Sequence, residues 1–401
     1  LARQHPGDYI TGFVRASKKA VRDAFDQHGV LPEQIVGIGV DTTGSTPLPV
    51  DASGTPLGML DAFRDDPHAQ AWLWKDHTSH EEAAEITALA ESRGEPYLAK
   101  CGSAYSSEWF WSKILRCRRV APKVFRAASS WVELADFVPA WITGNARPDR
   151  IVRGVCAAGH KAMFSPTWGG LPSESFLGAL HPDLAALRGR LYEHAVDSSH
   201  PAGRLTKEFA RKIGVPEGLP VAAGAFDAHH GAVGSGVAPG VLVKIIGTST
   251  CDITVWPSDE PLADIPGLCG VVDGSVTPGM YGLEAGQSAV GDIFNWVASL
   301  SSTKAKHEAL TRDASALRPG ASGLLTLDWH NGNRTVLVNP RLTGLVVGQT
   351  LHTTHAELYR SAIEATAFGA RVIVDRMEDY GVKISKITHC GGIAEKSALV
   401  N

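Results

Sequence analysis

Two segments near the middle of the chain combine residue types that could transfer a phosphoryl group to a hydroxyl. The first is the apolar run 220–226, which ends at Asp227 and is followed by small residues that predict a helix. The second is a hairpin pattern, in which strands 241–246 and 251–255 enclose Gly247-Thr-Ser-Thr250. Its tip offers the hydroxyls and backbone N–H groups that suit a phosphate. Asp227 adds a carboxylate that could accept the proton of a hydroxyl.

Each segment also has an ordinary structural explanation. An aspartate at the start of a helix commonly accepts hydrogen bonds from unpaired N–H groups of the first turn. Glycine, threonine and serine are common in turns that bind nothing. Neither segment therefore identifies a function by itself.

Composition excludes several classes of protein. The 401 residues are 44% hydrophobic, which is enough for two or three domains with their own cores. The net charge of -4 gives no basic surface, so we expect no nucleic-acid partner. No apolar run reaches the roughly 18 residues of a membrane span, so we expect no membrane partner. The six cysteines are scattered without a CxxC pair, which favours reduced thiols and a cytoplasmic location.

The elements around the two segments predict a mixed α/β protein. Apolar residues 35–40 and 47–50 bracket a hydroxyl-rich stretch and predict a further hairpin. The expected helices cover residues 81–91, 107–116 and 130–143, and Gly144 ends the last one.

Two other stretches bear on domain organisation. Residues 148–203 are rich in proline and glycine and predict loops. The Gly/Pro-rich stretch 234–240 marks a break in composition. We therefore expect a first domain over residues 1–236 and a second over residues 237–401.

Ordered matches along the whole chain resemble the FGGY family of carbohydrate kinases. The matching segments are residues 37–47, 73–78, 106–113, 157–163, 224–229, 246–252, 282–292 and 390–396. The resemblance implies a two-lobed ribonuclease-H-like fold, as in actin-like ATPases, with a sugar-binding lobe and a nucleotide-binding lobe. Within the family, the chain is most similar to the branch that converts L-ribulose to L-ribulose 5-phosphate in L-arabinose catabolism, using ATP and Mg²⁺.

The same resemblance implies a role for each candidate residue. Asp227 would be the general base, and Lys161 and Glu284 would bind the hydroxyls of the ketose. Gly44 would bring the backbone close to the sugar. The implied nucleotide-binding residues are Gly247, Thr248, Ser249, Thr250, Gly291, Gly391 and Gly392. No GxxxxGK[ST] segment occurs, so we expect hydroxyls and backbone N–H groups to hold the phosphates.

Family members begin earlier than this sequence, with a hairpin that helps to hold phosphate and Mg²⁺. They also continue beyond the helix that we expect to start at Ala394. The resemblance therefore implies a fragment in which both lobes are incomplete and no residue ligates the metal. Two alternatives stay open: a kinase for xylulose, glycerol or ribitol, and a sugar-binding protein that no longer transfers phosphate. A homodimer also stays open.

Overall fold

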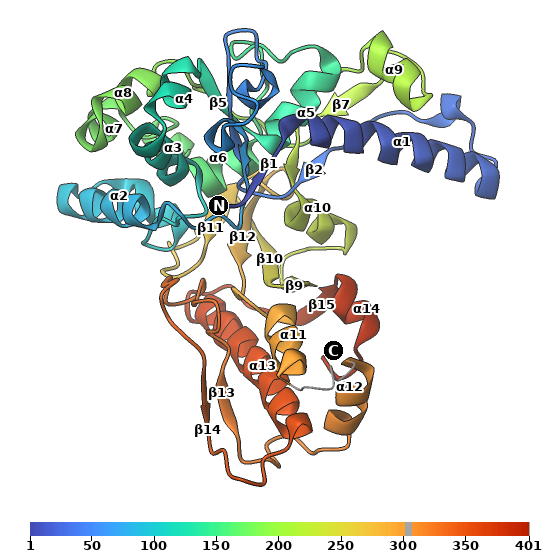
Figure 1. Ribbon diagram of the computed structural model, residues 1–401, viewed down its shortest axis with the longest axis vertical. Coiled ribbons are helices and arrows are strands. Elements are labelled where there is room, and N and C mark those ends of the chain that lie inside the picture. Colours follow the sequence, from blue (N-terminus) through green and yellow to red (C-terminus); the bar gives the residue numbers. More distant parts are fainter. Residues whose placement is uncertain (301–306, 401) are drawn as a thin grey trace. The chain divides into compact units, whose positions relative to one another are not determined.

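The computed structural model describes residues 1–300 and 307–400, and the chain forms two compact units (Figure 1). The first unit comprises Leu1–His230 with Val272–Met280, and the second comprises Gly231–Val271 with Tyr281–Asn401. Each unit contains both helices and strands. The domain boundary after residue 236 stays a prediction.

Short strands pair in the first unit, mostly between segments far apart in the sequence. The pairs are β1 (Arg3–Gln4) with β4 (Ala71–Trp72), β2 (Asp41–Thr42) with β8 (Ala225–Phe226), β3 (Pro47–Val50) with β5 (Ser130–Glu133) and β6 (Pro201–Arg204) with β7 (Pro220–Ala222). The pairing of β2 with β8 is parallel, and the other three are antiparallel.

The hairpin expected from residues 35–40 and 47–50 is wrong. All four residues of β3 are buried, and so are all four of its partner β5. Residues 35–40 instead approach β7 through an isolated parallel bridge at Ile38. Burial of every residue of β3 and β5 in the core outweighs the local turn signal, because removal of apolar side chains from water is the dominant favourable term in folding.

The rest of the first unit consists of helices joined by turns and loops. The helices are α1 (Pro6–His28), α2 (His80–Arg93), α3 (Phe110–Val120), α4 (Pro122–Ala127), α5 (Leu134–Thr143), α6 (Val155–Ala162), α7 (Glu174–Leu180), α8 (Pro182–Arg188), α9 (Lys207–Ile213) and α10 (Asp227–Gly234). Short 3-10 turns cover Pro32–Gln34, Leu57–Met59, Pro67–Ala69, Pro96–Cys101 and Pro166–Trp168. The last residues of α10 count with the second unit.

Some of the predicted helices are present and others are not. The helix over 81–91 is confirmed as α2, and α3 starts at Phe110 rather than at residue 107. The helix expected over 130–143 is a strand followed by a helix, because residues 130–133 form β5. Gly144 ends α5 in the left-handed conformation, with φ of 73°, as its position predicts. The loop-rich stretch 148–203 contains three helices, so that prediction is wrong.

A five-stranded sheet organises the second unit, in the order β11 (Gly270–Asp273), β12 (Met280–Ala285), β10 (Thr250–Pro257), β9 (Val241–Ile246) and β15 (Lys386–Cys390). The hairpin expected at 241–255 is confirmed by antiparallel β9 and β10, and β15 runs parallel to β9. A separate antiparallel pair joins β13 (Leu325–Leu327) and β14 (Leu345–Val347).

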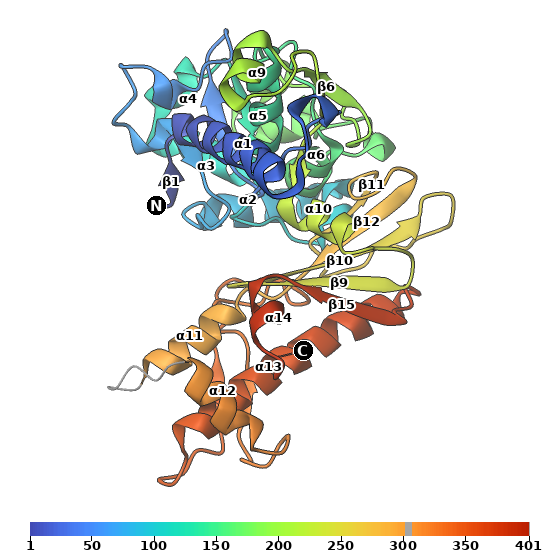
Figure 2. The ribbon, with the colours of Figure 1, turned by 90° about the vertical axis from the view of Figure 1, so that its right-hand side faces the viewer.

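Helix α13 (His355–Asp379) packs along one face of this sheet, as Figure 2 shows beside β9, β10 and β15. The other helices of the unit are α11 (Gly291–Ser299), α12 (His307–Ser315) and α14 (Gly392–Lys396). The helix expected from Ala394 thus begins two residues earlier and ends at Lys396, while Asn401 lies outside the described residues. Across residues 1–300 and 307–400, no helix is both long and apolar enough to cross a membrane.

Candidate active site

Asp227 is the first residue of α10, directly after β8. Strand β8 pairs in parallel with β2, so that Phe226 lies opposite Thr42. One carboxylate oxygen of Asp227, Oδ1, accepts a hydrogen bond from the backbone N–H of Ala228 at 2.8 Å. The residue is exposed to solvent. The strand-to-helix placement expected from the sequence is therefore present, with the carboxylate held at a fixed junction.

Lys161 lies near the end of α6 and is buried. Its Nζ atom is 5.5 Å from the ring centroid of Trp109 and 5.6 Å from that of Phe226, which is the range of a cation–π interaction. The Tyr105 hydroxyl donates to the carbonyl of Lys161 at 2.6 Å. The indole N–H of Trp111 donates to the next carbonyl at 2.8 Å. Aromatic residues therefore fix both the ammonium group and the helix end that carries it.

Gly44 packs against the same Phe226 ring. A Cβ atom added at Gly44 would overlap that ring, so glycine is required for this close approach. Gly44 and Lys161, which are far apart in the sequence, thus both lie against Phe226, and Asp227 is the next residue in the chain. Trp109 and Phe226 lie within matching segments but have no role predicted from the sequence, although the three aromatic residues of segment 106–113 were a visible signal.

A buried carboxylate fixes the other end of α6. Asp136 Oδ1 accepts the backbone N–H of Gly154 at 2.8 Å, just before the helix starts. Arg153 Nη1 lies 3.7 Å from Asp136 Oδ2. Burial raises the pKa of Asp136 to about 7, although the Arg153 charge and the Gly154 hydrogen bond oppose the shift. A Cβ on Gly154 would come within 2.5 Å of the Gly224 carbonyl, so α6 lies tightly against the segment that leads to Asp227.

The turn between β9 and β10 is closed by its own backbone. Gly247 N–H donates to the Ser249 carbonyl at 2.9 Å. The N–H of Gly291 donates to the Gly247 carbonyl at 3.1 Å, and that of Val290 donates to the Thr248 carbonyl at 2.8 Å. The start of α11 is therefore joined to the turn, and Gly247 and Gly291 are neighbours.

Gly391 comes close to Ile246, the last residue of β9 before this turn. Its φ is +92°, and an added Cβ would lie 2.5 Å from the Ile246 carbonyl oxygen. Gly391 and Gly392 also line an open hollow at the end of β15, together with Ile387, His389, Cys390, Ala394 and Glu395. The structure thus brings Gly247, Gly291 and Gly391 together in the second unit.

The four residues of the turn differ in their surroundings. Thr248 is exposed and Ser249 is half-buried, whereas Thr250 is buried. The Thr250 hydroxyl accepts the N–H of Gln287 at 2.9 Å and lies 3.4 Å from the Lys244 ammonium group. Thr250 therefore supports the turn. Thr248 and Ser249 are the better candidates for phosphate contact.

Carboxylates near the turn offer little for a divalent cation. Asp252 is buried, and both of its oxygens lie 3.0 Å from Lys244 Nζ. Asp292 is exposed in the first turn of α11. One exposed carboxylate falls short of the ligand set that Mg²⁺ uses. The described residues of the turn do not fit the ion by themselves, so we assign no metal ligand.

Glu284 lies on β12 in the second unit and is buried. Strand β12 pairs with β10, which begins at the end of the Gly247–Thr250 turn. The strand positions this carboxylate on a rigid element, and its contact with sugar stays a prediction.

Comparison with known proteins gives both sequence relatives and structural relatives. The chain is 41% identical to the ribulokinase of Vibrio parahaemolyticus, covering 99% of this chain and 74% of that protein. It is 42% identical to the ribulokinase of Shouchella clausii, covering 100% of this chain and 71% of that protein.

Solved structures share the fold at lower identity. Xylulose kinase from Rhodospirillum rubrum matches with a TM-score of 0.75 and 22% identity, over 100% of this chain and 75% of that one. Plasmodium falciparum glycerol kinase with ADP matches with a TM-score of 0.76 and 14% identity, over 99% of this chain and 75% of that one. These likenesses confirm the predicted actin-like ATPase fold.

Two domain matches cover nearly the whole sequence. Residues 10–234 match the N-terminal domain of the FGGY family of carbohydrate kinases, and residues 242–401 match its C-terminal domain. The predicted class of enzyme, a sugar kinase that transfers a phosphoryl group, is confirmed by these matches together with the sequence relatives. The chain belongs to the FGGY family of carbohydrate kinases.

Proposed function

We propose that this protein phosphorylates L-ribulose with ATP to give L-ribulose 5-phosphate. The observation that carries the proposal is the series of relatives named ribulokinase, which are 39–42% identical to the chain over nearly all of its length. The solved xylulose and glycerol kinases are 22% identical or less and support only the fold, so they do not favour those sugars.

Asp227 is the proposed general base. A sugar hydroxyl has a pKa far above neutrality, so a nearby carboxylate must accept its proton as the bond to phosphorus forms. An exposed carboxylate on a fixed strand-to-helix junction suits this role, because its Oδ1 is anchored by the Ala228 N–H.

Lys161, Glu284 and Gly44 are the proposed sugar-binding residues. An ammonium group donates to hydroxyl oxygens and a carboxylate accepts from hydroxyl protons, and such charge-assisted hydrogen bonds are about twice as strong as neutral ones. The aromatic rings around Lys161 restrict its ammonium group to one region, which favours selection of sugars by shape.

The turn Gly247–Thr250 and the glycines near it are the proposed nucleotide site. Thr248 and Ser249 would contact phosphates, while Gly291, Gly391 and Gly392 would allow close approach of the rest of the nucleotide. FGGY kinases use ATP with a divalent metal, and Mg²⁺ would reduce the charge on the phosphates. No described residue is assigned to the ion, and no step of the proposal depends on one.

The domain roles follow from the same proposal. Residues 1–236 would supply Gly44, Lys161 and Asp227 for the sugar, and residues 237–401 would bind the nucleotide and supply Glu284. A cytoplasmic location is consistent with the six cysteines, which all lie in the described part of the chain and form no disulfide. A homodimer stays a prediction.

A coupled ADP-release assay tests the proposal with L-ribulose, xylulose, ribitol and glycerol as acceptors. We expect the highest kcat/KM for L-ribulose. A parallel preparation of Asp227→Asn controls for contaminating kinases. A higher kcat/KM for another acceptor would overturn the ribulokinase assignment and leave the family unchanged.

A further inference from the structure

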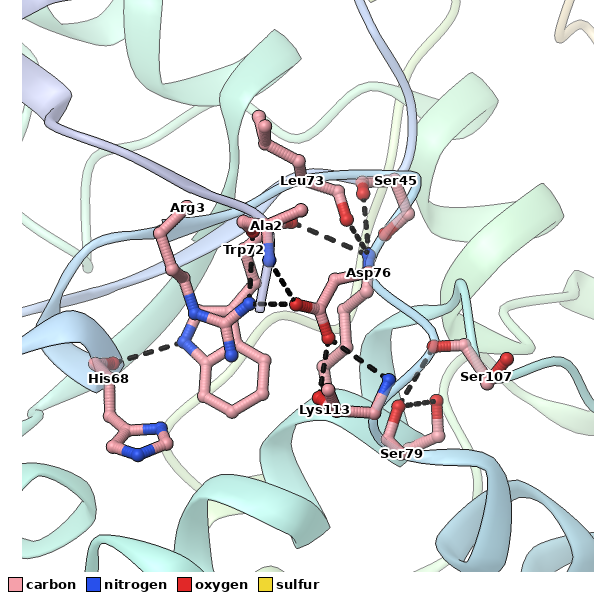
Figure 3. A network of polar contacts seen from close by, with 12 residues as sticks. Ala2, Arg3, Ser45, His68, Trp72, Leu73, Asp76, Ser79, Ser107 and Lys113 are labelled. Atoms are coloured by element: carbon pink, nitrogen blue, oxygen red, sulfur yellow. Dashed lines mark hydrogen bonds and ion pairs between the residues drawn. The ribbon is translucent and has the colours of Figure 1, made fainter. Parts of the chain in front are cut away.

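Lys113, on α3, is a fully buried lysine with an unusual set of partners. Its Nζ atom donates to the backbone carbonyls of Ser45 at 2.8 Å, Leu73 at 3.0 Å and Trp72 at 3.4 Å (Figure 3). Lysine is almost never fully buried unless its charge is compensated. These three carbonyls accept the three N–H donors of the ammonium group. The side chain therefore joins α3 to two separate backbone segments.

Glu133 binds the turn at Ser45 and Thr46 as well. It is buried at the end of β5, and its carboxylate accepts the Ser45 hydroxyl and, at 2.7 Å, the backbone N–H of Thr46. The N–H of Leu134 donates to the Thr46 carbonyl at 3.1 Å. Lys113 and Glu133 together therefore bind both main-chain and side-chain groups of residues 45 and 46.

The held turn is the one that carries Gly44. Gly44 precedes Ser45 and packs so closely on Phe226 that a methyl group would not fit between them. Phe226 in turn lies 5.6 Å from the Lys161 ammonium group and precedes Asp227 in the chain. A shift of Ser45 would therefore move the surface against which the proposed sugar site is built.

The electrostatics explain why the two buried groups need each other. Burial raises the pKa of Glu133, against the Ser45 hydrogen bond and the Lys113 charge. Burial lowers the pKa of Lys113 to about 7, against the carboxylates of Glu133, Glu108 and Asp76 and in the same direction as the Arg3 charge. Removing either partner leaves the other buried without its main compensating charge, which is costly.

We propose that Lys113 and Glu133 are positioning residues that clamp the turn at Ser45 and Thr46, and that this clamp sets Gly44 for sugar binding. The clamp acts through the backbone and touches neither substrate. The inference rests on the proposed function, because Gly44 is a sugar contact only in that proposal.

Two variants separate positioning from simple charge compensation. Lys113→Met keeps the length of the side chain but removes the donors to the three carbonyls. The double variant Lys113→Met/Glu133→Gln also removes the uncompensated buried charge. If the lysine only neutralises Glu133, the double variant should recover both thermal stability and sugar affinity.

Sugar and nucleotide affinities are measured separately by isothermal titration with L-ribulose and with ADP, together with Tm. We expect the double variant to recover most of the Tm lost by Lys113→Met, yet to bind L-ribulose about tenfold or more weakly than wild type, because the turn that carries Gly44 is no longer held. The Kd for ADP should change less than about twofold, and Lys212→Met, an exposed lysine on α9, should leave both affinities unchanged.

Recovery of L-ribulose affinity in the double variant would overturn the clamp. If Lys113→Met does not fold, the double variant and Glu133→Gln alone are compared with wild type, and unchanged sugar affinity in both would overturn it equally. A wild type that binds xylulose, ribitol or glycerol instead of L-ribulose refutes only the ribulokinase assignment, and the clamp is then judged with that acceptor. A wild type that binds none of the four sugars refutes both proposals.

Discussion

Replacing Asp227 by asparagine separates a catalytic base from a helix cap. Asparagine keeps an Oδ1 acceptor for the Ala228 N–H, which is the contact that anchors the side chain at 2.8 Å. The local geometry should therefore survive, while the group that takes the hydroxyl proton is lost. We expect kcat to fall by roughly 10² to 10⁴, and the KM for L-ribulose to stay within a few fold.

The magnitudes of the two roles differ enough to decide between them. A loss of 10² to 10⁴ in kcat corresponds to about 3 to 5 kcal/mol of transition-state stabilisation. A carboxylate that only interacts with the dipole of α10 contributes about 0.3 to 1 kcal/mol, and contributes it to stability rather than to turnover. The helix-cap role thus predicts a small drop in Tm with almost normal kcat. The catalytic role predicts a large drop in kcat with almost normal Tm.

The assay is ADP release coupled to NADH oxidation, with Tm measured on the same preparations. Glu208→Gln is a matched control, because Glu208 is an exposed acidic residue in the first turn of α9 and lies outside the proposed site. Turnover by Asp227→Asn above about half that of wild type would refute the catalytic role, since a general base contributes at least about a hundredfold.

Three further changes test other parts of the structure. Glu284→Gln should lower kcat/KM for L-ribulose by an amount equivalent to about 1.5 to 3 kcal/mol and leave the KM for ATP unchanged, whereas equal damage to both substrates in steady-state kinetics would indicate a role in folding. Gly44→Ala should lower the free energy of unfolding by about 1 to 3 kcal/mol through overlap with Phe226 and should raise the KM for sugar. Gly39→Ala, which has open space around it, should change neither quantity in denaturation and kinetic measurements. Burial would raise the pKa of Asp76, but hydrogen bonds from Thr78 and from the N–H of Ala2, together with the Arg3 charge, lower it to about 2 from 3.8. Ionised Asp76 should therefore add about 2 kcal/mol to the free energy of unfolding above pH 4, and this stabilisation is lost as the pH falls from about 4 to about 2. The difference in stability between wild type and Asp76→Asn in urea denaturation should shrink between pH 6 and about pH 3. A constant difference would contradict this prediction.

Local patterns predicted the parts of the site that depend on neighbouring residues. Asp227 at the end of a strand and the hairpin around Gly247–Thr250 are both present, because a strand followed by a glycine-containing turn is specified within about ten residues. The resemblance to the family supplied Lys161 and Gly44, and the structure shows that Phe226 brings them together.

Long-range pairing explains what the sequence did not predict. Residues 47–50 pair with residues 130–133 rather than with residues 35–40, and no local signal distinguishes these partners. The same pairing turned the start of an expected helix into a strand, because Trp131 and Val132 are fully buried beside β3. Lys113 lies in the matching segment 106–113 but has no predicted role, since the carbonyls that it binds belong to residues 40 or more positions away.

The position of β15 beside β9 has a consequence for the order of folding during synthesis. Lys386 pairs with Val241, so the second neighbour of β9 is made 145 residues after its first residue. At typical rates of about 5 to 20 residues per second, one edge of β9 lacks its partner for roughly 7 to 30 seconds on the ribosome. An unpaired edge next to the apolar residues Leu242 and Val243 is a template for wrong pairing with other chains. The nascent protein should therefore depend on chaperones in this interval, and synonymous codons that slow translation between residues 246 and 386 should lower its soluble yield.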